Sequence, residues 1–159
     1  VLWNAQPLGA RELFAAREQM APVFSDFHLF ARLYGLPAPD AAFAKELLSW
    51  FEMDSIVTLE EDRFSRRDLS AGQRKRLALV AALLERKPIL VLDEWAADQD
   101  PHFRAKFYRE ILPALKERGI TVVAVTHDDH YFDVADRRVH MEEGRLSELA
   151  LPTNAGGGA

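Results

Sequence analysis

Residues 69–94 run LSAGQRKRLALVAALLERKPILVLDE, and this stretch decides the fold. Ser70 stands where a helix N-cap belongs, and Gln73 follows three residues later, which is the pattern of a capping box. Pro88 ends the helix, and the apolar residues 89–92 predict a buried strand of a parallel sheet. Helix followed by buried strand is the alternation of an α/β protein. One buried helix stripe is predicted from four apolar residues at helical spacing: Leu77, Val80, Ala81 and Leu84.

The start of this helix carries basic residues where the helix dipole favours acidic ones. Arg74, Lys75 and Arg76 occupy the first turns. Together with Ser70 and the small Gly72, they predict an anion site, because free backbone N–H groups and positive charge attract phosphate. The simpler alternative is an ordinary capped helix with a solvated basic face.

Two acidic residues and a histidine end the two predicted buried strands. Asp93 and Glu94 follow the first strand, and His127 follows a second apolar run at 120–125. Open α/β sheets bind ligands at this carboxyl edge, so we expect these side chains to lie together if the strands are neighbours. One acid is then placed to hold Mg²⁺ and the other to polarise an attacking water. The alternatives are an acidic strand end facing solvent and a structural turn histidine.

A metal site is a further alternative for the loop around the histidine. His127, Asp128, Asp129 and His130 offer both imidazole and carboxylate ligands. Because they follow one another without a fixed helical spacing, this alternative is the weaker one.

The composition limits the class of protein. The chain has 159 residues, 48% of them hydrophobic, which is enough for the core of one domain. It has no cysteine, which excludes disulfides and thiolate metal sites. The formal net charge of -5 argues against a general nucleic-acid binder.

The remaining chain predicts a helix that begins at Asp100-Pro101, is kinked by Pro113 and ends at Gly119. Local patterns also predict strands at 1–4 and 22–25, helices at 10–19 and 41–50, and a hairpin of 137–141 with 145–149.

In this order, the segments closely resemble the nucleotide-binding domain of ABC ATPases. Residues 69–73 match the family signature, and residues 89–94 match Walker B with its catalytic glutamate. Asp100-Pro101 matches the end of the D-loop, and residues 126–128 match the switch histidine. The resemblance extends to about Leu149. It implies an α/β fold: the C-terminal part of a P-loop NTPase (RecA-like) core with an inserted helical subdomain.

The wording of three segments is similar to one branch of this family, the bacterial exporters of cyclic peptides and peptide siderophores. These segments are residues 24–30, 93–101 and 127–132. Residues 24–30 correspond to the Q-loop, which senses the nucleotide and the membrane domain. That loop normally carries Gln, but here Ser25 stands at its position with Asp26 beside it, so both are candidates for its contacts. The D-loop carries Ala97-Asp98-Gln99 in place of the commoner Ser-Ala-Leu, which predicts a more polar dimer interface.

The resemblance implies a role for each matching residue, with ATP and Mg²⁺ as cofactors. Asp93 would support Mg²⁺, Glu94 would polarise the water that attacks the γ-phosphate, and His127 would contact that phosphate. Four signature residues and one D-loop residue would act in a head-to-tail dimer, touching or flanking the ATP of the opposite subunit: Ser70, Ala71, Gly72, Gln73 and Asp100.

One family motif is missing. A P-loop reads G-x-x-x-x-G-K-[ST], but the sequence contains no Gly-Lys pair. The family order places this motif, the adenine-stacking aromatic residue and the membrane-spanning domain upstream of Val1. We therefore expect four parts: a partial ATPase core with the Q-loop (1–30), the helical subdomain with the signature helix (31–87), the C-terminal half of the core (88–150) and a disordered tail (151–159).

The expected function is that of an ATP-driven exporter subunit at the cytoplasmic face of the bacterial inner membrane. Its expected partners are the transmembrane domain of the same exporter and a second ATPase domain, not nucleic acid. One alternative is a soluble ABC-type ATPase of DNA repair or chromosome maintenance, although no long heptad coiled coil separates the motifs here. Another is an ATPase-dead module whose signature helix completes a partner's site.

Overall fold

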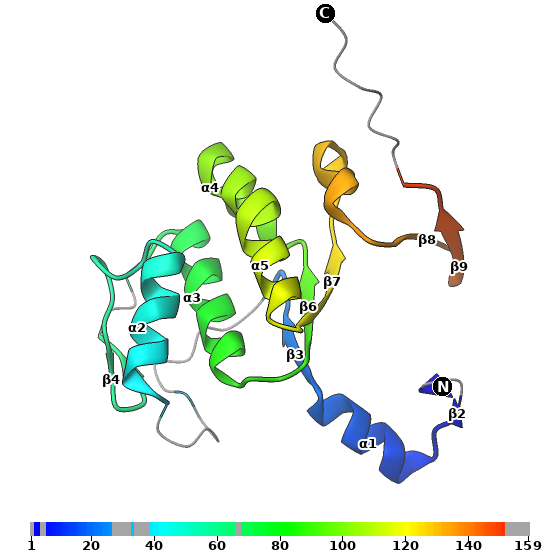
Figure 1. Ribbon diagram of the computed structural model, residues 1–159, viewed down its shortest axis with the longest axis horizontal. Helices are drawn as coiled ribbons and strands as arrows, with labels where there is room; N and C mark the ends of the chain where they lie inside the picture. The colour runs from blue at the N-terminus through cyan, green and yellow to red at the C-terminus, as the bar shows by residue number, and fades with distance from the viewer. Residues whose placement is uncertain (1, 4–5, 27–32, 34–38, 66–67, 152–159) are drawn as a thin grey trace, which may run out of the picture.

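A parallel three-stranded sheet forms the centre of the computed structural model (Figure 1). Its strands are β3 (Met20–Val23), β6 (Ile89–Asp93) and β7 (Thr121–Val125), in the order β3-β6-β7. Because all three run in the same direction, their carboxyl ends meet at one edge. Together with the helices, this sheet confirms the predicted α/β class. The structure describes residues 2–3, 6–26, 33, 39–65 and 68–151.

Helices and hairpins complete the described fold. The helices are α1 (Ala10–Glu18), α2 (Ala41–Trp50), α3 (Ala71–Leu84), α4 (Pro101–Lys106) and α5 (Leu112–Glu117), with a π-helical turn, η2 (Phe107–Ile111), joining the last two. Short 3-10 helices are η1 (Trp95–Asp98) and η3 (Asp129–Val134). Three antiparallel pairs are β1 (Leu2–Trp3) with β2 (Gln6–Pro7), β4 (Leu59–Glu60) with β5 (Arg63–Phe64), and β8 (Arg138–Glu142) with β9 (Arg145–Leu149).

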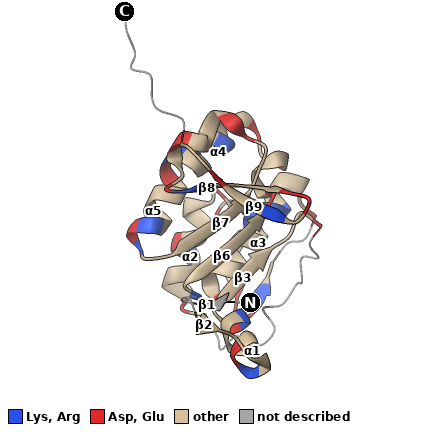
Figure 2. Ribbon diagram, turned by 90° about the vertical axis from the view of Figure 1, so that its right-hand side faces the viewer, with Lys and Arg blue, Asp and Glu red and all other residues tan. Residues whose placement is uncertain are grey.

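Helices cover one face of the sheet, and the opposite face is open over the described residues (Figure 2). The prediction of a buried second strand is therefore wrong. Val123 and Val125 on β7 are 50% and 52% exposed, because no described helix packs on their side of the sheet. The central strand β6 is different, since Leu90 and Leu92 point towards the helices and are buried.

The helix α3 is buried more widely than the predicted stripe. It packs against both α2 and β3, so apolar residues around much of its circumference are covered. Leu79, Ala82 and Leu83 are buried in addition to the predicted set, whereas Ala81 is only half-buried. The single-stripe prediction assumed one packing partner, but α2, β3 and η1 all pack on this helix.

Several local predictions are confirmed. Ser70 and Gln73 form the capping box, and Asp100 caps α4 by accepting from the Phe103 N–H. The predicted strand at 22–25 is shifted, since β3 ends at Val23. Pro22 lies inside β3, which Pro tolerates because, among the described residues, this strand pairs only with β6.

The predicted kink at Pro113 is present as a π-helical turn. The Leu112 N–H donates to the carbonyl of Phe107, five residues earlier. Proline has no N–H and its ring clashes with the carbonyl four residues before it, so the helix widens just ahead of Pro113. Gly119 then ends the helix with a φ of +77°. None of the helices in the described part of the chain combines the length and apolarity needed to cross a bilayer.

Candidate functional site

Four polar side chains converge at the carboxyl edge of the sheet. The Ser25 hydroxyl lies just beyond β3 and donates to Asp93 Oδ2 at 3.1 Å. Glu94 follows β6, and its Oε1 lies 3.1 Å from His127 Nε2 beyond β7. The structure thus places Asp93, Glu94 and His127 at one edge of the sheet, as the strand order predicted, and it adds Ser25 through the contact with Asp93. Asp26 is exposed beside Ser25, whereas residues 27–30 of the expected Q-loop lie outside the described residues.

The backbone of Glu94 has a strained conformation and is held by hydrogen bonds to two other elements. Its φ of +47° is in the left-handed region, which costs a non-glycine residue on the order of 1–3 kcal/mol and is found at functional sites. Its N–H donates to the Val125 carbonyl at 2.9 Å, and its carbonyl accepts from Lys75 Nζ at 2.9 Å. These bonds join Glu94 to β7 and to α3, so its side chain is directed at the histidine loop.

The surface beside Glu94 and His127 is open to solvent. A shallow hollow is lined by Glu94, Ala97, Thr126, His127 and Asp128. The side chains of Glu94 and His127 are 43% and 89% exposed, so neither is sequestered from solvent. Solvent or a small ligand in the hollow therefore has access to both side chains.

The alternative metal loop is not formed. Asp128 turns away from the histidines and accepts a hydrogen bond from the Tyr108 hydroxyl at 2.9 Å. His130 lies 3.8 Å from Asp129 on the exposed surface. Over the described residues, which include this loop, no three His, Asp or Glu side chains come together as a metal site.

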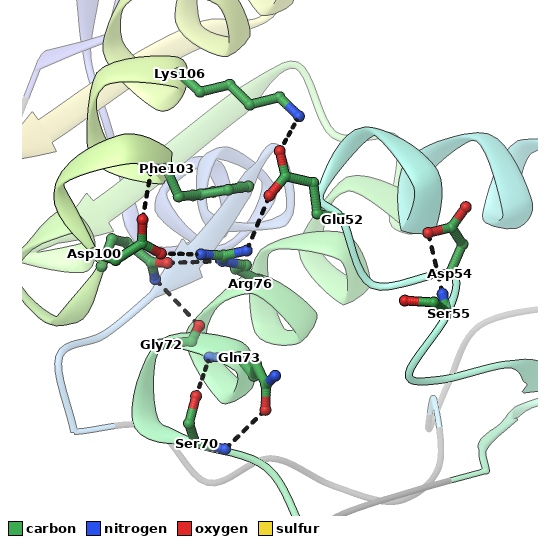
Figure 3. A network of polar contacts seen from close by, with 11 residues as sticks. Glu52, Asp54, Ser55, Ser70, Gly72, Gln73, Arg76, Asp100, Phe103 and Lys106 are labelled. Atoms are coloured by element: carbon green, nitrogen blue, oxygen red, sulfur yellow. Dashed lines mark hydrogen bonds and ion pairs between the residues drawn. The ribbon is translucent and has the colours of Figure 1, made fainter.

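The start of the signature helix is a second group of candidate residues, separate from the one at the sheet edge (Figure 3). Ser70 Oγ accepts from the Gln73 N–H at 3.2 Å, and Gln73 Oε1 accepts from the Ser70 N–H at 3.0 Å. Within the described residues, no hydrogen bond or ion pair joins either side chain to Asp93, Glu94 or His127. The signature residues and the strand-end residues therefore form two separate groups, although they belong to one continuous stretch of sequence.

The basic residues of this helix do not form the predicted anion-attracting cluster, and of the three only Arg74 is exposed. Lys75 is 4% exposed and pairs with Asp98 at 2.8 Å. Arg76 pairs with Asp100 at 2.6 Å. Both charges are therefore neutralised inside the chain, and the remaining Arg74 donates to the Leu69 carbonyl at 2.8 Å.

The D-loop segment packs directly on the signature start. A side chain at Gly72 would place its Cβ 2.8 Å from the Asp98 carbonyl oxygen, so only glycine allows this approach. Gln99 is 3% exposed, and its amide donates to the Gly72 carbonyl at 3.1 Å. The prediction that Gln99 adds polarity to a dimer interface is therefore wrong, because its side chain points into its own chain.

Arg76 is the centre of a polar network that sequence reasoning missed (Figure 3). Besides Asp100, its Nε donates to Gln99 Oε1 at 2.9 Å, and its guanidinium lies 3.5 Å from the centre of the Phe103 ring. Glu52, at the end of α2, accepts from Arg76 and from Lys106. The network ties the signature helix to the D-loop and to α2.

The pKa values of Arg76 and Asp100 in this network are both lowered, for different reasons. Burial lowers the pKa of Arg76, while its carboxylate neighbours oppose that effect. The Phe103 N–H holds the pKa of Asp100 below its usual range, and Arg76 adds to that effect. Asp100 is therefore a carboxylate that caps α4 and anchors α3. The sequence could have predicted that Arg76 points towards the interior, because its spacing places it on the same helix face as the buried Val80 and Leu83.

A protein-family comparison decides the identity. The family model described as ABC transporter matches residues 1–97, more than half of the 159 residues. The chain belongs to the ABC transporter family. The resemblance found in the sequence motifs is confirmed.

Curated relatives in this family include transport ATP-binding proteins. The chain is 49% identical over 138 residues to ATP-binding protein SyrD of Pseudomonas syringae pv. syringae, covering 84% of this chain and 23% of that protein. It is 34% identical over 140 residues to the thiamine import ATP-binding protein ThiQ of Histophilus somni, covering 82% of this chain and 65% of that protein. The chain thus spans less than two thirds of either relative.

Two solved structures have the same fold. The first, cbiO1 of Clostridium perfringens, superposes with a TM-score of 0.68 at 24% identity over 92% of this chain and 63% of that one. A bacterial Atm1-family ABC exporter with ATP bound superposes with a TM-score of 0.70 at 19% identity over 85% of this chain and 26% of that one. At these identities the likeness supports the fold, here a P-loop NTPase core.

Proposed function

We propose that this chain is part of the ATP-hydrolysing subunit of an ABC exporter, which moves a cyclic peptide or peptide siderophore across the bacterial inner membrane. The observation that carries the proposal is the convergence of Asp93, Glu94 and His127 at the carboxyl edge of the sheet, with Glu94 Oε1 3.1 Å from His127 Nε2. An acid–imidazole pair facing an open hollow suits activation of a water against a phosphate.

The described residues offer oxygen ligands for Mg²⁺, but the chain has no P-loop to hold the phosphates of the nucleotide. Asp93 and Ser25 offer a carboxylate and a hydroxyl oxygen, the ligands that Mg²⁺ prefers. When bound, the cation would neutralise charge on the phosphates. The chain has no Gly-Lys pair, so the cradle for the phosphates would come from a P-loop elsewhere in a longer protein. In that proposal, Glu94 orients and deprotonates water, and His127 holds the phosphate oxygen.

The signature residues suit a different nucleotide. Ser70 and Ala71 are exposed at the start of α3, and Gly72 and Gln73 are half-buried. We therefore assign Ser70, Ala71, Gly72, Gln73 and Asp100 to the face met by ATP on a second subunit. The same proposal includes the four-part division of the chain, although residues 152–159 lie outside the described structure. It also includes the binding of this ATPase domain to a transmembrane domain.

The export assignment rests on the pattern of the relatives. SyrD, at 49% identity, is matched over 23% of its length, and the Atm1-family exporter is matched over 26% of its chain. Both therefore have room for further domains in the same polypeptide. The import ATP-binding protein ThiQ is matched over 65% of its length, at the lower identity of 34%.

The missing P-loop yields a prediction for the 159-residue chain alone. We expect no ATP binding in the micromolar range and no turnover, because phosphate positioning supplies most of the catalysis in such sites. Isothermal calorimetry with ATP and Mg²⁺ measures the affinity. Micromolar binding would show that the phosphates are held without a P-loop.

Export is tested on the longer protein that carries this chain. Reconstituted in proteoliposomes, it should move a labelled cyclic peptide into inverted vesicles only with ATP and Mg²⁺. A linear peptide of the same composition serves as the control cargo. ATP hydrolysis that is unaffected by any cyclic peptide, with no transport, would leave the ATPase assignment standing and contradict the export assignment.

A further inference from the structure

His127 needs support that its own surroundings do not supply. Its side chain is 89% exposed, so packing against neighbours does not orient it. Its ring nevertheless lies 3.1 Å from Glu94. An exposed imidazole holds such a position only if the backbone on both sides of it is held. The residues that hold Thr126 and Asp128 are therefore the ones that place the ring.

The Tyr108 hydroxyl contacts both residues that flank His127. It lies 2.8 Å from Thr126 Oγ1 and donates to Asp128 Oδ2 at 2.9 Å. The Asp128 N–H in turn donates to Thr126 Oγ1 at 3.1 Å, which closes a small ring of contacts around the histidine backbone. Tyr108 is 3% exposed, and this burial raises its pKa further above the usual range. The hydroxyl therefore keeps its proton and remains a donor.

Arg104 connects the same loop to the segment that follows Glu94. Its guanidinium lies 3.5 Å from Asp128 Oδ1. Its Nη2 donates to the Ala97 carbonyl at 3.0 Å and to the Gln99 carbonyl at 3.1 Å. One side chain thus spans from the D-loop segment to the residue after His127. It fixes the distance between the two loops that carry the catalytic pair.

The helix that presents these two side chains is distorted at this place. Arg104 lies on α4, four residues before Tyr108, and Tyr108 lies in the π-helical turn. Such turns are often found at functional sites, because they redirect side chains out of the regular helical order. The Tyr108 ring is fixed further by stacking on Tyr131, with centroids 4.4 Å apart and planes at 11°.

We propose that Tyr108 and Arg104 are positioning residues, which hold the His127 loop at the distance from Glu94 that hydrolysis requires. This inference rests on the proposed ATPase function. Neither residue contacts the reacting atoms; both act through Thr126, Asp128 and the D-loop carbonyls.

The test uses the longer ATPase and removes a single oxygen atom. Tyr108→Phe keeps the buried ring and its stacking but deletes the hydroxyl. We expect kcat for ATP to fall by about 5- to 20-fold with KM within about twofold, because small misplacement of a catalytic group lowers the rate more than binding. Tyr131→Phe is the matched control, since it makes the same deletion on the stacked neighbour and no hydroxyl bond is found there among the described residues. It should leave kcat unchanged.

A double substitution separates positioning from general loss of structure. In the His127→Ala background, Tyr108→Phe should lower kcat no further, because the group it positions is gone. An equal fall in both backgrounds, or a kcat for Tyr108→Phe that matches Tyr131→Phe, would overturn the proposal. Arg104→Lys keeps the charge but loses the two-carbonyl geometry, so we expect it to behave like Tyr108→Phe.

A measurement without ATP keeps the inference independent of the proposed function. Amide hydrogen exchange of Asp128 in the 159-residue chain reports the bond to Thr126 Oγ1. Tyr108→Phe should accelerate this exchange several-fold, while amides of β6 stay unchanged. If His127→Ala leaves hydrolysis intact, or the longer protein does not hydrolyse ATP, the proposed function fails, and the exchange rate alone decides whether Tyr108 holds the loop. Unchanged exchange in Tyr108→Phe would show that it does not.

Discussion

Glu94→Gln is expected to lower ATP turnover of the longer transporter by about 10²- to 10⁴-fold, the usual contribution of a general base. The amide has nearly the same shape as the carboxylate and keeps an oxygen towards His127. It is not basic, so it does not accept the proton of the attacking water. Because the surrounding backbone contacts of Glu94 to Val125 and Lys75 involve main-chain atoms, the substitution leaves them in place.

The measurement is steady-state phosphate release combined with ATP affinity. We expect the affinity to stay within a few-fold of the unaltered protein, since the change removes a contact made in the transition state. Glu117→Gln is the matched control, because this exposed glutamate on α5 lies outside the site. If Glu94→Gln retains more than about a tenth of the turnover, Glu94 is not the base.

Trp95→Ala is expected to lower the free energy of unfolding by about 3–5 kcal/mol, the range for deleting a large buried aromatic side chain. Trp95 is 2% exposed and lies within 6.4 Å of the Phe51 and Phe103 rings and 4.4 Å from Phe107. Its Nε1–H also donates to the Lys75 carbonyl at 2.8 Å. The substitution leaves a cavity where α2, α3 and α4 meet.

Urea denaturation of the 159-residue chain, followed by far-UV circular dichroism, measures this effect. Phe14→Ala is the control, because Phe14 on α1 is 66% exposed and its loss should change stability by no more than about 0.5 kcal/mol. A loss below about 1 kcal/mol for Trp95→Ala would mean that the core repacks around the missing ring. Since Trp95 follows Glu94 directly, we also expect the Lys75–Glu94 contact to loosen.

The positions of the catalytic pair were predictable because they follow from strand ends. Two apolar runs, 89–92 and 120–125, each end in a polar residue, and parallel neighbours bring those ends to one edge. The contact between Ser25 and Asp93 was not foreseen, although Ser25 was placed in the right loop. It depends on β3 ending at Val23, and strand ends depend on pairing more than on local sequence.

Whether the basic residues of α3 are buried or exposed depends on the packing of elements that are distant in sequence. Lys75 and Arg76 carry the signal of a solvated or anion-binding helix start, yet both are buried against carboxylates. Their partners, Asp98 and Asp100, lie more than twenty residues away, so no local pattern links them. Gln99 turned inward for the same reason, because its partners Gly72 and Arg76 are supplied by another element.

The sequence by itself determined the family, the capped signature helix, the distortion at Pro113 and the polar residues that follow β6 and β7. These follow from periodicity, caps and proline geometry, which act over a few residues. Only the tertiary structure decided that β7 has an open face, that Arg76 joins three elements and that Tyr108 reaches both neighbours of His127. Burial and long-range hydrogen bonds depend on which elements meet, and that is settled by packing of the whole chain.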